Sequence, residues 1–168
     1  MAVSLTGSIQ LLGSLLYQNP LDMRSVEDQL PIQWSKAFTS GTGADQVNRL
    51  WADQRTLASL ATEDLDLAGV LVDGFGVAIA FAKIKAMLFR NNSIVAGENL
   101  EIGGAGANGF INWIKDATDI VILGPGGILA LIAPVDGYAV IAATGDLLTV
   151  TNAGAASIIY DVVLVGNA

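Results

Sequence analysis

The stretch Glu63–Arg90, E-D-L-D-L-A-G-V-L-V-D-G-F-G-V-A-I-A-F-A-K-I-K-A-M-L-F-R, decides the fold class of this chain. Leu65 and Leu67 alternate with Asp64 and Asp66 at its start. Because successive side chains of a strand point to opposite faces, this period of two predicts strands with one buried face. We expect the whole stretch to fold as strand, turn, strand, turn and strand.

The same period returns at the end of the stretch, in K-I-K-A-M-L-F. It predicts that one face carries Ile84, Ala86 and Leu88 and the other carries Lys83, Lys85, Met87 and Phe89. Further on, Gly, Asn and Asp clusters separate short apolar runs at a spacing of roughly 8 to 12 positions, which is typical of a sandwich or barrel. No strand alternates with a long helical segment, so the sequence predicts an all-β protein and disfavours a parallel α/β sheet.

Two apolar runs allow sharper predictions. Ile158–Val165 is β-branched and apolar almost throughout, which predicts a central strand of the core, buried on both faces. Ile120–Leu123 and Ile128–Ala133 flank G-P-G-G, a tight turn. These two runs are expected either to pair as a hairpin or to pass from one sheet to the other at a corner.

The first part of the chain differs from the rest. Residues 1–45 combine Pro20 and Pro31 with a polar cluster and end in a Gly-rich joint, which indicates an extended N-terminal arm with one or two short strands. An ordinary strand pair packed on its own domain is the alternative. Residues 46–168 are expected to form a β-sandwich domain, with an early strand around 48–56.

The composition indicates that this protein has partners. Hydrophobic residues make up 52% of the 168 residues and charged residues 14%, whereas a typical soluble domain has about 25% charged residues. Apolar surface therefore needs a partner, and we expect a homo-oligomer. Aromatic residues concentrate at interface centres, and the candidate interface residues are Leu12, Leu16, Trp34, Phe38, Trp51 and Trp113, although Trp51 could equally be a core anchor.

The charge pattern argues against two classes of partner. The net charge is −8, and the eight basic residues are scattered along the chain, so we expect no nucleic-acid binding, which depends on clustered Lys and Arg. The start of the chain has no basic residue before Arg24 and so does not resemble a secretory signal. The apolar run from Ile120 to Val135 is shorter than the ~20 residues of a membrane helix, and no membrane association is expected.

No residue pattern predicts catalysis. Cysteine and histidine are absent, which removes thiolate nucleophiles, His-based triads and the usual zinc ligands. Gly104–Gly109 matches G-x-G-x-x-G but lacks a following helix pattern, so it is interpreted as a sheet loop. Glu63, Asp64 and Asp66 lie together without a calcium-loop spacing. We therefore expect no enzyme, no cofactor and no metal site.

Four segments together resemble a known family. They are S-G-T-G-A-D-Q-V-N-R-L-W-A-D-Q-R-T-L, A-T-E-D-L-D-L-A-G-V-L-V-D-G-F-G, F-A-K-I-K-A-M-L-F and G-D-L-L-T-V-T-N-A-G-A-A-S-I-I-Y-D-V-V-L-V-G. Over residues 40–166 the chain resembles small structural proteins of tailed bacteriophages, encoded among the head and tail genes. The resemblance implies a virion component that is assembled in the host cytoplasm. By analogy with phage cement proteins, it further implies an antiparallel jelly-roll-like sandwich that trimerises on the capsid.

Three classes of function follow from these observations. The first is a capsid decoration or cement protein that binds the major capsid protein from outside and stabilises the shell. The second is a tail, fibre or receptor-binding component of the virion. The third, an enzyme, would need converging carboxylates in a substrate pocket.

Overall fold

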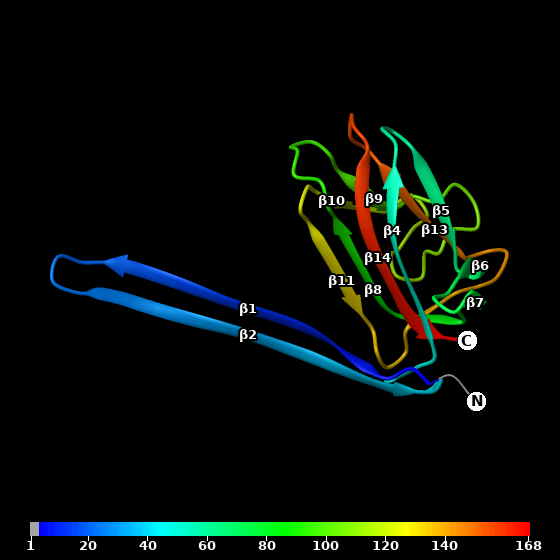
Figure 1. Cartoon of the computed structure of the whole chain (residues 1–168), viewed down its shortest axis with the longest axis horizontal. Helices are drawn as coiled ribbons and strands as arrows, with labels where there is room; N and C mark the ends of the chain where they lie inside the picture. Colours follow the sequence, from blue (N-terminus) through cyan, green and yellow to red (C-terminus); the bar gives the residue numbers. More distant parts are fainter. Residues whose placement is uncertain (1–3) are drawn as a thin grey trace.

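The computed structural model describes residues 4–168, which form strands and contain no helix. Two antiparallel sheets pack face to face, and a long two-stranded ribbon projects from one end of them (Figure 1). The prediction of an all-β protein is confirmed. In this part of the chain, no helix is long and apolar enough to cross a membrane.

One sheet has five strands and the other has four. The five-stranded sheet has the order β11-β8-β14-β4, with β12 paired to β8, and its strands are β4 (Arg49–Leu57), β8 (Lys83–Asn91), β11 (Ile128–Ile132), β12 (Tyr138–Ala139) and β14 (Ile158–Asn167). The four-stranded sheet has the order β10-β9-β13-β5, with β5 (Thr62–Asp66), β9 (Leu100–Gly103), β10 (Ile120–Leu123) and β13 (Leu147–Asn152). The predicted early strand near residues 48–56 is β4.

The pairing of the sandwich strands is nested. The first pairs with the last, β4 with β14, and inside them lie the pairs β5–β13, β8–β11 and β9–β10, all antiparallel. A small separate hairpin, β6 (Ala68–Val72) with β7 (Ala78–Ala80), connects β5 to β8. The sandwich therefore has the connectivity of one long hairpin folded over on itself. Most of its strand pairs join residues that are far apart in sequence.

The core lies between the two sheets. Leu65 and Leu67 are fully buried, as the alternation at the start of β5 predicts, whereas Asp64 is exposed. The other members of the core come from both sheets and include Trp51, Leu57, Met87, Phe89, Leu100, Ile102, Leu148, Val150, Ile158, Tyr160, Val162 and Leu164. No residue of the projecting ribbon belongs to this core.

Strand β14 lies at the centre of the five-stranded sheet, between β8 and β4, as predicted. Its burial on both faces was wrongly predicted. Val162 and Leu164 are fully buried, while Val163 and Val165 are only half-buried, because the second face of this sheet has no layer packed on it. The strand is therefore half-buried in the ordinary manner of a sandwich.

The predicted alternation through β8 is interrupted by a bulge. Val165 pairs with Ala86 but Gly166 pairs with Ile84, so Lys85 is an extra residue in β8. The bulge shifts the phase, and Ile84 and Met87 both reach the core. Lys85, predicted on the face of Met87 and Phe89, is buried at the bulge with 1% of its surface exposed.

The G-P-G-G turn changes sheets. β10, before the turn, pairs with β9, and β11, after it, pairs with β8 of the other sheet. Of the two predicted alternatives, the corner is confirmed and the hairpin is excluded.

The N-terminal part forms a ribbon of two long strands, which corrects the prediction of one or two short ones. β1 (Gly7–Pro20) pairs with β2 (Ser25–Ser40) over its full length, and residues 21–24 form the turn. At about 3.4 Å per residue, fourteen paired residues give a ribbon of about 45 Å. A short parallel pairing of β2 with β3 (Gln46–Val47) joins it to the sandwich.

Candidate functional site

The strand register of the ribbon sorts its residues into two unlike faces. Directly opposed residues of an antiparallel pair share a face, and successive residues alternate. One face, here called the apolar ribbon face, carries Ile9, Leu11, Leu15, Tyr17, Val26, Leu30, Ile32 and Trp34, with Asn19, Asp28 and Lys36 as its polar members. The other, the polar ribbon face, carries Ser8, Gln10, Ser14, Gln18, Glu27, Gln29, Gln33 and Ser35, interrupted by Leu12, Leu16 and Pro31.

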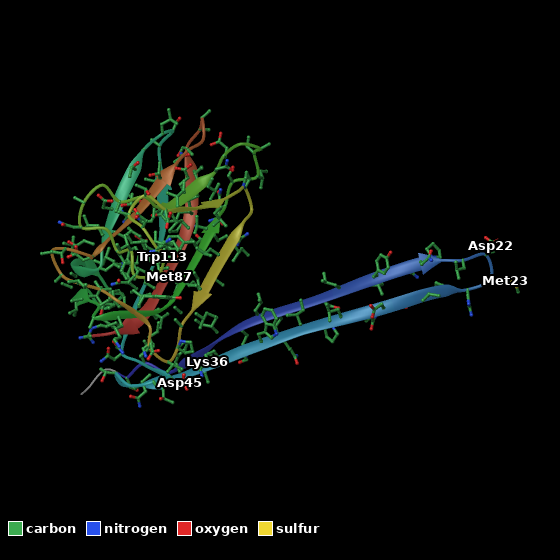
Figure 2. All side chains as sticks on the ribbon, turned by 180° about the vertical axis from the view of Figure 1, so that it is seen from behind. Asp22, Met23, Lys36, Asp45, Met87 and Trp113 are labelled. Carbon is green, nitrogen blue, oxygen red and sulfur yellow. The ribbon has the colours of Figure 1, made fainter. Side chains whose placement is uncertain are left out.

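The apolar ribbon face is open to solvent. Leu15 is 60% exposed, Trp34 67% and Tyr17 79%, and side chains project from both sides of the ribbon far from the sandwich (Figure 2). Aromatic side chains offer roughly 150–250 Å² each, so the six most exposed apolar residues of this face present on the order of 700 Å². An isolated two-stranded hairpin is at best marginally stable in water. This face is therefore a candidate binding surface.

The joint at the base of the ribbon is held in place by side chains. Lys36 Nζ lies 2.8 Å from Asp45 Oδ1, and both residues are near the point where the ribbon meets the sandwich (Figure 2). The Thr39 amide donates to the Asp45 carbonyl at 3.0 Å, and Asn167 Nδ2 donates to the Thr42 carbonyl at 2.9 Å. The Gly-rich joint is thus tied to the C-terminal strand, and it is not a free hinge.

Lys85 forms the centre of this attachment. Its ammonium group donates to the carbonyl oxygens of Gly43, Pro134 and Val135 at 3.1, 3.0 and 2.6 Å. An ammonium has three donors, so all of them are used. Burial lowers the pKa of Lys85, and the nearby positive charge of Lys83 lowers it further. Lys85 therefore joins the ribbon joint, the loop after β11 and the bulge of β8.

A second apolar surface lies on the outer face of the five-stranded sheet. The register aligns its outward residues in rows across four strands: Leu50, Val165, Ala86 and Ile132 in one row, Ala52, Val163, Leu88 and Ala130 in the next. Ala86 is already covered, with 1% of its surface exposed. The third row contains Gln54, Asp161, Arg90 and Ile128. The solvated face of an antiparallel sheet is ordinarily polar. Two complete rows without a polar side chain therefore make this face, here called the outer sheet face, a second candidate contact surface.

The four predicted interface residues of the arm have different positions. Trp34 lies on the apolar ribbon face. Leu12 and Leu16 are exposed, but they lie on the polar ribbon face. Phe38 is buried at the base with 5% of its surface exposed, which leaves it little area for a partner.

The two other candidates belong to the sandwich. Trp51, on β4, is 5% exposed and part of the core, in agreement with its interpretation as a core anchor. Trp113 packs partly buried against the core, and its Nε1 donates to the Phe110 carbonyl at 2.9 Å. Both indoles are therefore occupied within their own chain.

Sequence reasoning missed the division of the ribbon into faces. Leu11 and Leu15 belong to one face and Leu12 and Leu16 to the other, and the doubled leucines of L-L-G-S-L-L hide the period of two. Aligning the two halves of the arm around a turn at Asp22 and Met23 would have revealed the apolar pairs.

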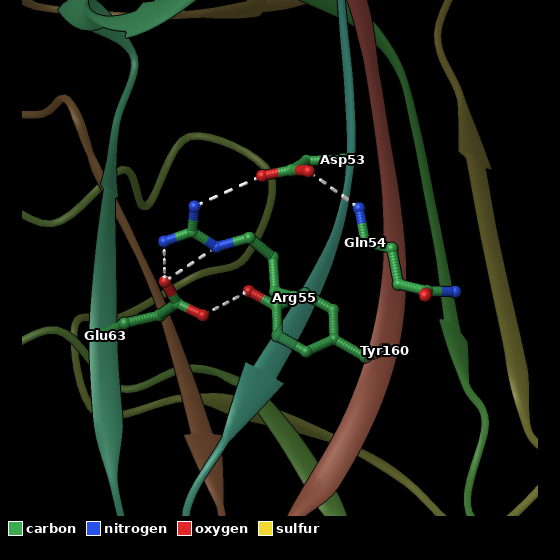
Figure 3. A network of polar contacts seen from close by, with 5 residues as sticks. All are labelled: Asp53, Gln54, Arg55, Glu63 and Tyr160. Atoms are coloured by element: carbon green, nitrogen blue, oxygen red, sulfur yellow. Dashed lines mark hydrogen bonds and ion pairs between the residues drawn. The ribbon is translucent and has the colours of Figure 1, made fainter.

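A polar network joins the two sheets at the β4–β5 edge (Figure 3). Glu63 Oε1 accepts a hydrogen bond from the Tyr160 hydroxyl at 2.8 Å, and Glu63 Oε2 accepts from Arg55 Nε at 3.0 Å. Arg55 also bonds Asp53 Oδ2 through Nη1 at 3.2 Å. The bond to Glu63 raises the pKa of Arg55, while burial, and then the same carboxylate, raises the pKa of Tyr160. The network bridges β4, β5 and β14 and keeps the phenol protonated.

The acidic residues of β5 are used separately. Beside the Glu63 network, Asp64 Oδ1 accepts from the Thr149 hydroxyl at 2.6 Å, and Asp66 Oδ1 accepts from the Ala68 amide at 2.8 Å. Within residues 4–168, no three carboxylates are grouped so that they could hold a metal ion. Each carboxylate therefore supports a strand or a turn.

The Gly104–Gly109 segment lies in the long connection after β9. The amides of Asp146 and Leu147 both donate to the Asn108 carbonyl at 3.0 Å, and the Phe110 amide donates to the Leu147 carbonyl at 2.8 Å. The segment is thus held against the start of β13, in agreement with its interpretation as a sheet loop.

Comparison of the chain with protein-family models, with curated proteins and with solved structures found no match.

Proposed function

We propose that this chain is a non-enzymatic structural protein of a tailed-bacteriophage virion, a capsid decoration or cement protein that binds the outside of the shell and stabilises it. The observation that carries the proposal is the ribbon of about 45 Å, which presents an open apolar face from a base held by side chains. Such a surface is suited to bind another protein, and the resemblance over residues 40–166 to phage structural proteins supports a virion as the setting.

The nested pairing supports a jelly-roll arrangement of the sandwich. In a jelly roll, eight strands form two Greek keys across two sheets. Here β4–β14, β5–β13, β8–β11 and β9–β10 pair from the outside inward, with the four pairs divided between two sheets. Viral capsid domains use this architecture, as do lectins and cupins. The fold alone therefore leaves the function to be argued from the surface.

The two apolar surfaces support the proposed partners, which are the major capsid protein and further copies of this chain, with a trimer as the proposed oligomer. A cement protein must contact the shell and also its own copies, and the chain has a ribbon face and a sheet face to offer. The net charge of −8 and the scattered basic residues favour protein partners over nucleic acid.

Locating the chain on the particle tests the proposal. A cryo-EM map of virions should show one sandwich and one ribbon per copy on the outer surface of the head. Density at the tail would instead assign the chain to a tail, fibre or receptor-binding component, and its absence from particles would refute the virion role.

A shortened ribbon tests the role of the ribbon itself. Gln10 and Ser35 are directly opposed, so an Asn-Gly turn can replace residues 11–34 and keep the base, including Phe38. The thermal midpoint of the sandwich should stay unchanged, because no ribbon residue belongs to the core, while binding to heads stripped of this protein should fall at least tenfold. The matched control keeps the full ribbon and changes Gln29 and Gln33 of the polar ribbon face to alanine.

A further inference from the structure

We infer that the apolar ribbon face of one copy packs on the outer sheet face of a second copy of this chain. The inference rests on the proposed assembly role and names the contact that would hold the copies together. It uses both apolar surfaces in a single interface.

The first argument is that the ribbon does not cover its own sheet. Its residues are exposed along most of their length, and the ribbon extends away from the sandwich in both views (Figures 1 and 2). The base is held by the Lys36–Asp45 ion pair and by the three bonds of Lys85 to Gly43 and the loop after β11. In this arrangement the ribbon lies clear of its own sheet, so we assign the surface that covers it to another molecule.

The second argument is the match in size and chemistry. The apolar run from the Asn19–Val26 pair to the Leu11–Trp34 pair extends over about 27 Å at ~3.4 Å per residue. The outer strands of the receiving sheet, β11 and β4, lie about 14 Å apart at ~4.8 Å per strand. The ribbon is therefore long enough to cross all four strands. The area of on the order of 700 Å² that it offers is close to the ~800 Å² that each partner contributes to a standard interface.

The third argument is charge. Asp28 is the single charged residue among the apolar ribbon residues between Val26 and Trp34, directly opposite Tyr17. Arg90 borders the apolar rows of the sheet, between Ile128 on one side and Asp161 on the other. Within residues 4–168, neither Asp28 nor Arg90 belongs to an ion pair. Arg90 already lies directly opposite Asp161, so the contact would add a second carboxylate beside Arg90 and would give Asp28 a positive partner that the residues between Val26 and Trp34 do not supply.

The charge argument also separates this contact from a ribbon-to-ribbon contact. Two apolar ribbon faces packed on each other would leave the outer sheet face uncovered and would bring no positive partner from their apolar stretch to Asp28. A contact of ribbon on sheet joins unlike surfaces. It therefore forms a ring, such as a trimer, or a reciprocal exchange between two copies, or, where the rotation does not close, an open filament.

Cross-linking between single-cysteine variants tests the contact, since the chain has no cysteine of its own. Leu30→Cys marks the apolar ribbon face, and Ala52→Cys and Ala130→Cys mark exposed positions on opposite sides of the outer sheet face. One variant of each mixture has a longer N-terminal tag, so that mixed and like pairs differ in size. A short bis-maleimide should join Leu30→Cys to a sheet variant.

Two matched controls define the background. Gln29→Cys lies next to Leu30 but on the polar ribbon face, and Glu101→Cys lies on the outer side of the other sheet. Each should yield at least fivefold less of the mixed product. Equal yields from the controls, preferential linking of Leu30→Cys to itself, or a monomeric mass of the full chain by light scattering would overturn the inference.

Trp34→Glu gives an independent readout by light scattering. It should lower the association constant of the full chain at least tenfold, while Gln33→Glu, on the polar ribbon face, should leave it within twofold. Equal effects would overturn the inference. These assays use no particles, so they are independent of the proposed function. A ribbon-to-sheet cross-link in a protein that is absent from virions would refute only the proposed function. A protein that decorates the capsid but shows no such cross-link would refute only this contact.

Discussion

Removing the ammonium group of Lys85 should loosen the ribbon base and destabilise the sandwich. In Lys85→Met the side chain keeps its approximate volume, but the carbonyls of Gly43, Pro134 and Val135 lose their donor. Hydrogen bonds to a charged group contribute about 1.5–3 kcal/mol each, and removing the buried charge recovers several kcal/mol of desolvation. We therefore expect a net loss of about 3 kcal/mol in the free energy of unfolding.

Urea denaturation measures this loss, and thermal unfolding should show it as a fall of about 6–12 °C in the midpoint for a chain of this size. Hydrogen exchange should also accelerate at the amides of Gly41 and Asp45, which donate to Val47 and Pro134. The control is Lys83→Met, an exposed lysine on the same strand. If Lys85→Met unfolds at the same urea concentration as the unmodified chain, the three carbonyl bonds do not hold the joint and the reasoning is wrong.

Three further predictions concern the sandwich. Leu164→Asp should prevent folding, since an unpaired buried charge costs several kcal/mol against a total stability of about 5–15 kcal/mol. Val163→Asp, on the outer face, should keep the circular dichroism spectrum of the folded chain and weaken only its self-association. Loss of the fold in both variants would place Val163 in the core. The free energy of unfolding of the unmodified chain should fall as the pH rises above 10. In the unfolded chain the Tyr160 phenol ionises with its ordinary pKa of 10.0, whereas the raised pKa in the folded chain keeps it protonated. Tyr160→Phe should flatten this pH dependence in urea titrations between pH 9 and 11, and an unchanged slope would exclude Tyr160 as its source. Gly166→Ala should lower the free energy of unfolding by about 1–3 kcal/mol, since the new methyl group would meet the backbone of β8 at the bulge. Gly74→Ala adds a methyl group in open space and should lower it far less. Equal thermal midpoints for the two variants would contradict this packing.

The fold class and several strands could be predicted from local patterns. The alternation at Leu65 and Leu67, the β-branched run in β14 and the G-P-G-G corner all appear in the structure, because side-chain period and turn chemistry depend on neighbours in sequence. The same locality explains the errors. A bulge depends on the partner strand, so the burial of Lys85 in β8 could not be predicted from the period of β8 itself.

The candidate contact surfaces depend on pairing over longer distances. That the arm is apolar is visible in its leucines and in Trp34, but only the register of β1 against β2 places Leu11, Leu15 and Leu30 on one face and Leu12 on the other. The outer sheet face is even harder to predict from the sequence, since its rows combine residues of four strands, β4, β8, β11 and β14, from between residues 50 and 165.

By itself, the sequence determined that this protein is built of strands, that it is rich in apolar residues and poor in charged ones, and that it contains no cysteine or histidine. Those properties follow from composition and from interactions between neighbouring residues. The tertiary structure decided which apolar side chains remain exposed: Trp51 is part of the core, Phe38 is buried at the base, and Trp34 is exposed to solvent. The physical reason is that the burial of a side chain depends on the residues that pack against it. In a sandwich of nested strand pairs, those residues come from distant parts of the chain.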